Sequence, residues 1–300
     1  MIGLFVASVF WAGDLLTKPA RGSTGVPDGH LHAYSLTFES ATGIKLNAWF
    51  VPGSSGAGAL LLLHSIRSNK RTMLPRARFL SALGFSLLLV DFQAHGESEG
   101  DRISFGYREA ADVRASVMKL QELAPGERVG VLGTSLGAAS LLLSDIQPLL
   151  AAVVLESLYP TIEEAVANRL RLRFGAIGPW LSPLLLAQLA PRLGVTPAQI
   201  RPIERVPLLR CPVMVVHGSE DRHTTIQEAQ RIFAAVPGPK EFYLLSGAAH
   251  VDLHAFGGKE YEHRIGEFFA RHLRRRANPA FNRTRRPAPF FQVERRRSPD

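Results

Sequence analysis

The sequence predicts an α/β protein with a mostly parallel central sheet flanked by helices. Short runs of consecutive apolar residues, typical of strands buried on both faces, occur at 59–63, 85–90 and 129–132. Stretches with helical spacing separate these runs, and such alternation is characteristic of parallel sheets. The chain has 300 residues, of which 46% are hydrophobic, and this is enough to form one large domain of the class.

The first half of the chain is expected to supply one edge of the sheet and its first buried strands. Two alternating stretches, His32 to Phe38 and Lys45 to Val51, flank the turn-forming residues 40–43 and predict an antiparallel hairpin. The next predicted elements are a strand at Ala59 to Leu63, a helix at Thr72 to Leu83, a strand at Phe85 to Val90 and a helix at Phe105 to Leu123.

The second half continues the alternation after one interruption. The predicted elements are a strand at Val129 to Leu132, a helix to about Leu143, strands at Ala151 to Leu155, Val213 to Val216 and Glu241 to Leu245, and helices at Ile226 to Val236 and about Tyr261 to Leu273. Residues 158–207 contain helical stretches near Ile162 to Phe174, Trp180 to Leu189 and Pro197 to Ile200. About fifty residues exceed a plain crossover, so we expect an inserted helical lid there.

The basic charge is concentrated at the C-terminus. The formal net charge is +9, and residues 274–300 hold nine arginines against Glu294 and Asp300. This segment has four prolines and no helical or alternating period, so we expect a disordered tail after a folded domain at residues 30–273. An arginine-rich tail can bind nucleic acid or acidic lipid, but the composition favours a solvated extension, and we expect no nucleic-acid partner.

The first 29 residues are interpreted as an apolar segment followed by a linker. Residues 2–13 are almost continuously apolar, yet a membrane span needs roughly 18 to 20 such residues, and Asp14 ends the run. Three interpretations stay open: a shallow membrane anchor or the remnant of a longer one, a helix packed on the domain, and a signal segment. Lys18 and Arg21 favour the cytoplasmic side, so we expect a cytoplasmic protein or one bound peripherally to the membrane from that side.

One turn is central to the functional interpretation. The strand at 129–132 leads directly into Gly133-Thr134-Ser135-Leu136-Gly137, after which small and apolar residues predict a helix. A serine at the apex of so tight a turn has a strained backbone, and glycines two positions before and after it let strand and helix approach closely. The pattern predicts a nucleophilic hydroxyl at the end of a buried strand, although five residues alone also fit an ordinary glycine-rich turn.

Four further motifs follow predicted apolar strands. They are His64-Ser65-Ile66, Asp91-Phe92-Gln93-Ala94-His95-Gly96-Glu97-Ser98, His217-Gly218-Ser219-Glu220-Asp221 and Gly247-Ala248-Ala249-His250. Together with the serine turn, they make the chain from about residue 37 to 273 resemble serine hydrolases of the α/β-hydrolase fold, near the esterase, lysophospholipase and serine-aminopeptidase (S33-like) branch. The joint occurrence of these motifs in this order is specific to that fold.

The resemblance implies a catalytic triad of Ser135, Asp221 and His250. A serine hydroxyl needs an imidazole that takes its proton, and His250 follows the last predicted strand, whereas His254 lies near a predicted helix start. A carboxylate must orient the imidazolium, and in this fold the acid lies between the serine and the histidine in the chain. The family's His-Gly-x-x-Asp pattern selects Asp221 over three competitors, Glu220, Glu156 and Asp252.

The resemblance also implies an oxyanion hole formed by the backbone N–H groups of Leu136 and Ile66. The family has His-Gly in the second of these loops, where this chain has His64-Ser65, and the β-carbon of Ser65 restricts the loop. The remaining polar residues of the motifs are interpreted as structural. They are His64, Asp91, His95 and Ser98.

Apolar residues of the lid are expected to cover the site. They are Phe174, Ile177, Trp180, Leu181 and Leu184, each of which also fits core packing. Together they indicate an apolar acyl or alkyl group in the substrate. The ten histidines are scattered, and the single cysteine, Cys211, excludes a Cys-x-x-Cys pair, so we expect no metal and no cofactor.

The sequence therefore predicts a cofactor-independent serine hydrolase. Its reaction would cleave a carboxylic ester, thioester or amide with an apolar acyl group through an acyl-Ser135 intermediate, and its partner would be a small ester or lipid-like molecule. Two alternatives remain: an acyltransferase with the same triad, and a hydrolase-shaped binding or membrane-scaffold protein without catalysis. The sequence predicts no oligomeric state.

Overall fold

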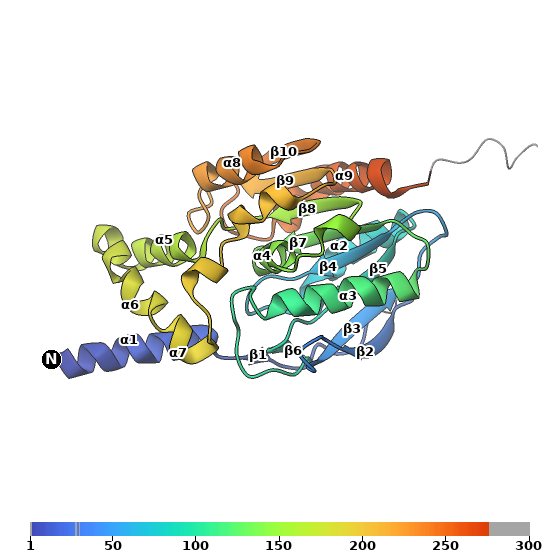
Figure 1. Cartoon of the computed structure of the whole chain (residues 1–300). Coiled ribbons are helices and arrows are strands. Elements are labelled where there is room, and N and C mark those ends of the chain that lie inside the picture. The colour runs from blue at the N-terminus through green and yellow to red at the C-terminus, as the bar shows by residue number, and fades with distance from the viewer. Residues whose placement is uncertain (1, 28, 30, 276–300) are drawn as a thin grey trace, which may run out of the picture.

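A sheet of eight strands forms the centre of the computed structural model (Figure 1), which describes residues 2–27, 29 and 31–275. The strand order is β10-β9-β8-β7-β4-β5-β3-β2. The strands from β10 to β5 are parallel to one another, which confirms the predicted sheet. They are β4 (Ala59–Leu63), β5 (Ser86–Val90), β7 (Val129–Thr134), β8 (Ala152–Glu156), β9 (Val213–Gly218) and β10 (Lys240–Leu245).

The other two strands form the predicted antiparallel hairpin at the edge of the sheet. β2 (Tyr34–Glu39) pairs with β3 (Lys45–Val51), and β3 pairs antiparallel with β5. β2 has a neighbour on one side only, and its residues are exposed or half-buried, whereas most of β3 is buried. The hairpin therefore marks the end of the hydrophobic core on this side.

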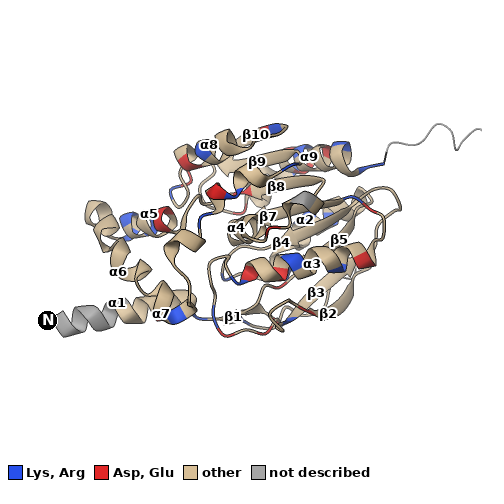
Figure 2. Ribbon diagram, viewed as in Figure 1, with Lys and Arg blue, Asp and Glu red and all other residues tan. Residues whose placement is uncertain are grey.

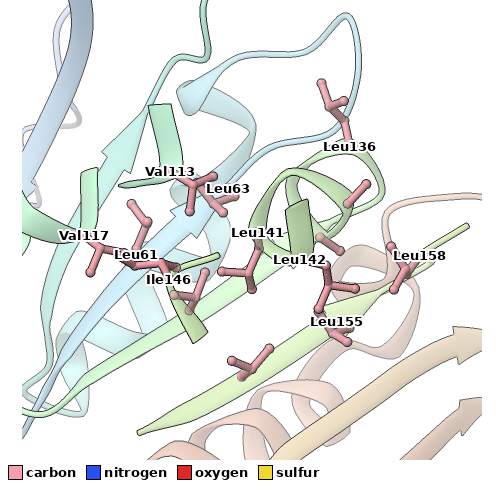
Figure 3. Close-up of a cluster of buried hydrophobic side chains, with 14 of the residues drawn as sticks. Leu61, Leu63, Val113, Val117, Leu136, Leu141, Leu142, Ile146, Leu155 and Leu158 are labelled. Carbon is pink, nitrogen blue, oxygen red and sulfur yellow. The ribbon is translucent and has the colours of Figure 1, made fainter. Parts of the chain in front are cut away.

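Helices cover both faces of the sheet. Along β4, Leu61 and Leu63 face one hydrophobic layer while Leu60 and Leu62 face the other, as the two-residue period of a strand requires. Figure 3 shows part of the first layer. This layer includes residues of α3 (Glu109–Leu123), α4 (Leu136–Leu143) and α8 (Ile226–Ala235), and the second includes residues of α2 (Leu74–Ala82) and α9 (Leu253–Leu273).

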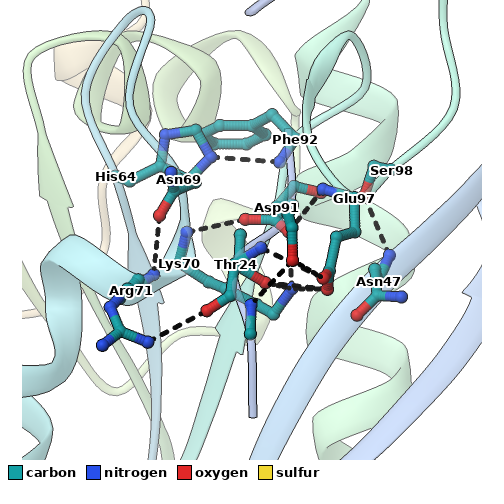
Figure 4. A network of polar contacts seen from close by, with 12 residues as sticks. Thr24, Asn47, His64, Asn69, Lys70, Arg71, Asp91, Phe92, Glu97 and Ser98 are labelled. Atoms are coloured by element: carbon teal, nitrogen blue, oxygen red, sulfur yellow. Dashed lines mark hydrogen bonds and ion pairs between the residues drawn. The ribbon is translucent and has the colours of Figure 1, made fainter. Parts of the chain in front are cut away.

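A buried ion pair ties the N-terminal linker to the sheet (Figure 4). Lys70 is completely buried, and its Nζ lies 2.6 Å from Asp91 Oδ2 and 2.9 Å from Glu97 Oε2. Lys70 Nζ also donates to Thr24 Oγ1, and Thr24 in turn donates its backbone N–H and its hydroxyl to Glu97. Burial alone would raise the pKa of Glu97, but the hydrogen bonds from Lys70 and Thr24 hold that pKa at about 2.

The linker also adds a strand that the sequence analysis did not predict. β1 (Ala20–Arg21) pairs parallel with β6 (His95–Gly96) to form a separate two-stranded sheet. Two residues are too few to show a hydrophobic period, so no pattern could indicate this pairing.

The N-terminal helix α1 (Ile2–Thr17) packs against the helices that follow β8. Arg192 donates to the Asp14 carboxylate at 2.7 Å and to the Phe10 carbonyl at 2.6 Å, and Arg102 donates to the same carboxylate. Residues 10–17 therefore pack on the domain, as one of the three open interpretations expects. Within the described ranges, no helix is long and apolar enough to cross a membrane.

The described residues between β8 and β9 form helices and turns without a strand. They include α5 (Ile162–Phe174), a 3₁₀ helix at Gly175–Leu181, α6 (Ser182–Leu186) and α7 (Leu189–Leu193). Figure 1 shows these helices and α1 gathered at one end of the molecule. The bounds of the helical stretch predicted around Trp180 to Leu189 differ from those of the structure. There the 3₁₀ helix ends at Leu181 and α6 begins at Ser182, with Pro183 in its first turn, where proline is favoured.

The predicted start of the helix at Phe105 is also wrong, because α3 begins at Glu109. Phe105 has a positive φ of 56°, which is incompatible with the helix. The Glu109 carboxylate accepts hydrogen bonds from the backbone N–H groups of Ser104 and Gly106 and thereby holds the preceding residues in a loop.

Three other predicted segments differ from the structure or lie outside it. The last helix begins at Leu253 rather than near Tyr261, and Gly258, with a φ of 53°, kinks it. The helix predicted from Thr72 is a 3₁₀ turn at Lys70–Met73 followed by α2. The tail for which we expect disorder lies outside the described residues from position 276 onward.

The Lys70–Asp91 pair leads to a stability prediction. Lys70→Met leaves the Asp91 carboxylate buried without its charged partner, so it should lower the free energy of unfolding by about 3–5 kcal/mol in urea denaturation. Lys119→Met is the matched control, because Lys119 forms an exposed pair with Glu122, and its loss should change that free energy by less than about 1 kcal/mol. Equal effects of the two substitutions would contradict the prediction.

Candidate active site

Ser135 occupies a strained turn between β7 and α4. Its φ of 50° and ψ of −105° lie outside the regions that ordinary residues favour. The turn is held from both sides, because the Ser135 N–H donates to the Glu156 carbonyl at 2.8 Å and the Ser135 carbonyl accepts from Ala139 N–H at 3.0 Å. The strand-to-helix turn that the sequence indicates is therefore present.

The glycines around Ser135 are required by close packing. A β-carbon on Gly133 would lie 2.7 Å from the backbone nitrogen of Ala138, and one on Gly137 would lie 2.6 Å from the carbonyl oxygen of Leu63. Both separations are shorter than real β-carbon contacts, so a larger residue would push α4 away from β4 and β7. The pattern of two glycines thus has a steric cause.

Glu156, a competitor for the acid of the triad, supports the turn instead. Its Oε2 accepts from Thr134 Oγ1 at 2.9 Å and from Arg76 Nη2 at 2.9 Å, and its Oε1 accepts from the Tyr261 hydroxyl. Arg76 also pairs with Asp252, another competitor, at 2.8 Å. These two carboxylates are therefore engaged in a structural network beneath the turn.

Asp221 and His250 lie together on the loops that follow β9 and β10. His250 Nδ1 donates to Asp221 Oδ2 at 2.7 Å. The carboxylate also accepts from the backbone N–H groups of His223 and Thr224 and from the Thr224 hydroxyl. Burial alone would raise the pKa of Asp221, but these bonds, with that from His250 foremost, lower it. A charged Asp221 fixes the His250 ring and leaves Nε2 available to accept a proton.

Ser135 is not hydrogen-bonded to this pair. Across the described residues, Ser135 Oγ makes no hydrogen bond to His250, so the predicted triad is linked by a hydrogen bond only between Asp221 and His250. Hydrogen bonds between catalytic groups are often long before the substrate binds. The His223 ring stacks on the His250 ring, with centroids 4.9 Å apart, and supports the face of the imidazole.

Two backbone N–H groups near Ser135 belong to Leu136 and Ile66. Leu136 is the first residue of α4, and Ile66 lies on the loop that follows β4, and both line the same pocket as Ser135. In the described part of the chain, neither N–H donates to a protein acceptor. These groups are the predicted oxyanion donors.

His64 braces the loop that carries Ile66. Its Nε2 accepts from the Phe92 N–H at 3.2 Å, so the ring proton is on Nδ1, which donates to the Ser65 carbonyl at 2.7 Å. Complete burial, with a smaller contribution from His95, lowers the pKa of His64 to about 3. His64 is therefore neutral at physiological pH, in line with its interpretation as a structural residue.

A mostly apolar pocket of about 440 Å³ opens above Ser135. Leu136, Ile66, Phe105 and Tyr159 line it on the side of the sheet. The opposite walls come from α5 and from the N-terminal helix α1, whose contributions include Trp11, Leu15 and Leu16. The N-terminal segment, which lies before the predicted domain at residues 30–273, thus forms part of the pocket.

The expected lid residues contribute unequally to this pocket. Phe174 lines it, whereas Trp180, Leu181, Leu184 and Ile177 do not, and Trp180 is 84% exposed. The apolar wall comes instead from Ile162, Val166 and Leu170 on α5 together with α1. The helical period of residues 162–174 could have indicated the α5 stripe, but no sequence signal placed α1 opposite it.

Other features of the structure do not compete for the chemistry. A cleft of about 750 Å³ lies between α2 and α9, on the other face of the sheet from α4. It is lined by mixed charged and apolar residues that include none of Ser135, Asp221 and His250. Within the part of the chain that the structure describes, no group of three or more His, Cys, Asp or Glu side chains could hold a metal ion.

Comparison with known proteins assigns the family. The model of the alpha/beta hydrolase family matches residues 60–264, which is more than half of the chain. The chain belongs to the alpha/beta hydrolase family. An uncharacterised protein of Mycobacterium tuberculosis is 31% identical over 235 residues, which cover 75% of this chain and 74% of that protein. A Bacillus subtilis protein, also uncharacterised, is 23% identical over 78% of each chain.

Solved structures share the alpha/beta hydrolase fold. An esterase of Pyrococcus furiosus superposes with a TM-score of 0.71 at 22% identity, covering 86% of this chain and 98% of that one. An esterase of Exiguobacterium antarcticum superposes with a TM-score of 0.59 at 14% identity, covering 79% and 99%. At these identities the similarity establishes the fold alone.

The buried histidines lead to a pH prediction. Burial holds the folded-state pKa of His64 far below its ordinary value of 6.5, so the unfolded chain binds more protons between about pH 3 and 6.5. The contribution of His64 to the free energy of unfolding is therefore complete at pH 7 and should fall as the pH is lowered from 6.5 to 5. Ordinary carboxylates titrate below this range.

Urea denaturation of wild type and His64→Gln at several pH values within this range measures the effect. The variant should lose less stability per pH unit, by up to about 1.4 kcal/mol, because one group no longer titrates on unfolding. Identical pH slopes for the two proteins would show that His64 is not held neutral by folding.

Proposed function

We propose that the protein is a serine hydrolase that cleaves a carboxylic ester with an apolar acyl group through an acyl-Ser135 intermediate. The observation that carries this proposal is the strained turn that presents Ser135 to an apolar pocket at the carboxyl end of β7. The Asp221–His250 hydrogen bond supports it, since it fixes an imidazole with a free Nε2 on the loop that follows β10, at the same edge of the parallel sheet. Membership of the alpha/beta hydrolase family agrees with this chemistry.

In the first half of the proposed reaction, His250 Nε2 takes the proton from Ser135 Oγ while Oγ attacks the carbonyl carbon of the ester. The carbonyl oxygen becomes an oxyanion, which the N–H groups of Leu136 and Ile66 would stabilise because both lack a protein acceptor. The imidazolium then gives its proton to the leaving alcohol, and the carbon–oxygen bond to the alcohol breaks. An acyl-Ser135 ester remains.

In the second half, a water molecule repeats the attack. His250 Nε2 takes a proton from the water, the hydroxide adds to the acyl carbon, and the same two N–H groups meet the second oxyanion. Protonation of Ser135 Oγ by His250 releases the carboxylic acid and restores the enzyme. Asp221 stays ionised throughout and stabilises the imidazolium, as its lowered pKa permits.

The pocket around Ser135 and the solved proteins that share the fold favour an ester as the substrate. The pocket around Ser135 is lined mainly by apolar side chains and suits an acyl or alkyl chain. Several solved proteins that share the fold are named as esterases, among them that of Pyrococcus furiosus. Thioesters and amides would use the same groups.

Substitution of the three residues tests the proposal with a p-nitrophenyl ester. Ser135→Ala and His250→Ala should each lower kcat/KM by about 10⁴-fold or more, and Asp221→Asn should lower it by a comparable factor because the imidazole loses its orientation and charge partner. Glu220→Gln, an exposed neighbour of Asp221, is the control and should leave kcat/KM unchanged.

Labelling by a fluorophosphonate probe gives an independent measurement. Wild type and Glu220→Gln should be labelled, and Ser135→Ala should not. Labelling that survives Ser135→Ala, or full ester turnover by that variant, would eliminate Ser135 as the nucleophile.

We also propose that α1 binds peripherally to a membrane surface. Phe10 and Trp11 are 52% and 68% exposed, and exposed aromatic side chains on an apolar helix favour the membrane interface. Ile177 and Trp180, at the same end of the molecule, are also exposed. An apolar substrate could then pass from the membrane to the pocket wall that α1 forms.

Sedimentation with anionic lipid vesicles tests this membrane proposal. Phe10→Ser combined with Trp11→Ser should reduce the bound fraction several-fold, because it removes apolar surface that would enter the interface. Tyr34→Ser on the edge strand β2 removes an equally exposed aromatic side chain and should leave binding unchanged. Equal binding by all three proteins would refute an interfacial role of α1.

A further inference from the structure

The pocket above Ser135 combines apolar walls with an excess of positive charge. Three arginines line it, Arg67, Arg169 and Arg173, and none of its other lining residues is acidic. Arg67 has a structural role, because its Nη1 donates to the Leu15 carbonyl at 2.9 Å and holds the end of α1. The other two arginines belong to α5, where they are four residues apart and therefore lie on the same face one turn from each other.

Arg169 is half-buried without a carboxylate partner. Its Nη1 donates to the Ala165 carbonyl at 3.0 Å, and it forms no ion pair with any described residue. The carboxylates that attract it from a distance, Asp221 and Glu228, are bound to other groups: Asp221 to His250, and Glu228 to Asn168. The guanidinium therefore gives up water without receiving an anion in exchange.

Arg76, which is almost completely buried, has a different environment. Arg76 is paired with both Glu156 and Asp252, and these charges raise its pKa well above the ordinary value despite burial. For Arg169, burial is the largest effect and the pKa is lowered. A buried charge without a partner costs free energy, which a bound anion would offset.

The helix itself does not account for the position of Arg169. Basic residues in the last turn of a helix are favoured by the helix dipole, and this explains Arg171 and Arg173. Arg169 lies a turn earlier and faces the pocket. The acidic residues of α5, Glu163 and Glu164, are in its first turn and pair with Arg201 and Arg231, so they leave the basic end of the helix uncompensated (Figure 2).

We propose that Arg169 and Arg173 bind an anionic group of the substrate, a carboxylate or a phosphate, next to its apolar chain. The proposal rests on the proposed ester hydrolysis and narrows its substrate class to single-chain amphiphilic esters with a negative charge. The apolar stripe of Ile162, Val166 and Leu170 on α5 would contact the chain, while the guanidiniums on the same helix would contact the anion. A neutral ester of the same length would leave Arg169 unpaired.

Ligand binding to the full-length Ser135→Ala protein tests the proposal without turnover. Isothermal titration calorimetry with decyl phosphate, decanoate and decanol compares three ligands that share a ten-carbon chain. The two anions are used below their micelle concentrations, and decanol below its solubility limit. At least one anionic ligand should bind about tenfold or more tightly than decanol. Inorganic phosphate, titrated alone, shows whether the anion binds without a chain, and decyl phosphate against decanoate shows which anion is preferred.

Substitutions in α5 identify the residues responsible. Arg169→Gln should abolish most of the preference for the anionic ligand, Arg173→Gln should reduce it, and Arg169→Lys should retain part of it because the charge is kept. Arg171→Gln is the matched control, since Arg171 is on the same helix, does not line the pocket and bonds to the Asn168 side chain. It should leave the preference unchanged. Because Arg173 is exposed, Arg173→Gln should fold and still tests the proposal if Arg169→Gln does not fold.

Equal affinity for decanol and both anionic ligands would overturn the proposal, and so would a preference that survives both Arg169→Gln and Arg173→Gln. Failure of the proposed hydrolase function is detected separately. Loss of that function would appear as absent fluorophosphonate labelling of wild type, which does not depend on the charge of a ligand. Labelled protein without anion preference would refute only the present inference.

Discussion

The strained backbone of Ser135 is the constraint on which the site depends. A non-glycine residue in such a conformation costs on the order of 1–3 kcal/mol and persists only where the surrounding structure enforces it. Here β8 holds the turn through the Glu156 carbonyl, and Gly133 and Gly137 allow β7 and α4 to close around it. The buried network of Glu156, Arg76 and Tyr261 lies beneath and links the turn to α2 and α9. The parallel core therefore determines where the hydroxyl is presented.

Two helices outside the central sheet, α1 and α5, also contribute to the site. α1 and α5 form the walls of the pocket, and Arg192 and Arg67 fasten α1 to the rest of the domain. The linker that follows α1 is fixed by the buried Lys70. The walls of the pocket above Ser135 thus include the N-terminal helix as well as the insertion between β8 and β9, and the arginines of α5 give the pocket positive charge.

Much of the fold could be predicted from the sequence, because buried parallel strands are continuous apolar runs, and the motifs at their ends lie at one edge of the sheet. Asp221 and His250, which are hydrogen-bonded in the structure, could be predicted because they match the family's motifs and follow predicted strands. The role of α1 could not be predicted, since an apolar helix packs equally well on a protein or a membrane surface. The start of α3 could not be predicted either. It depends on a hydrogen bond from the Ser104 N–H to the Glu109 carboxylate, and the periodicity of apolar residues does not indicate such a contact.

We propose that Ser135, Leu136 and Ile66 together form the reacting centre of the pocket, and that α1 and α5 form the walls that bind the substrate chain. A crystal structure of the protein treated with a long-chain alkyl fluorophosphonate tests this most directly. We expect a phosphorus–Oγ bond at Ser135, the phosphonyl oxygen within about 3 Å of the Leu136 and Ile66 nitrogens, and the alkyl chain between α1 and α5. A phosphonate attached elsewhere, or an alkyl chain that leaves the pocket away from both helices, would contradict it.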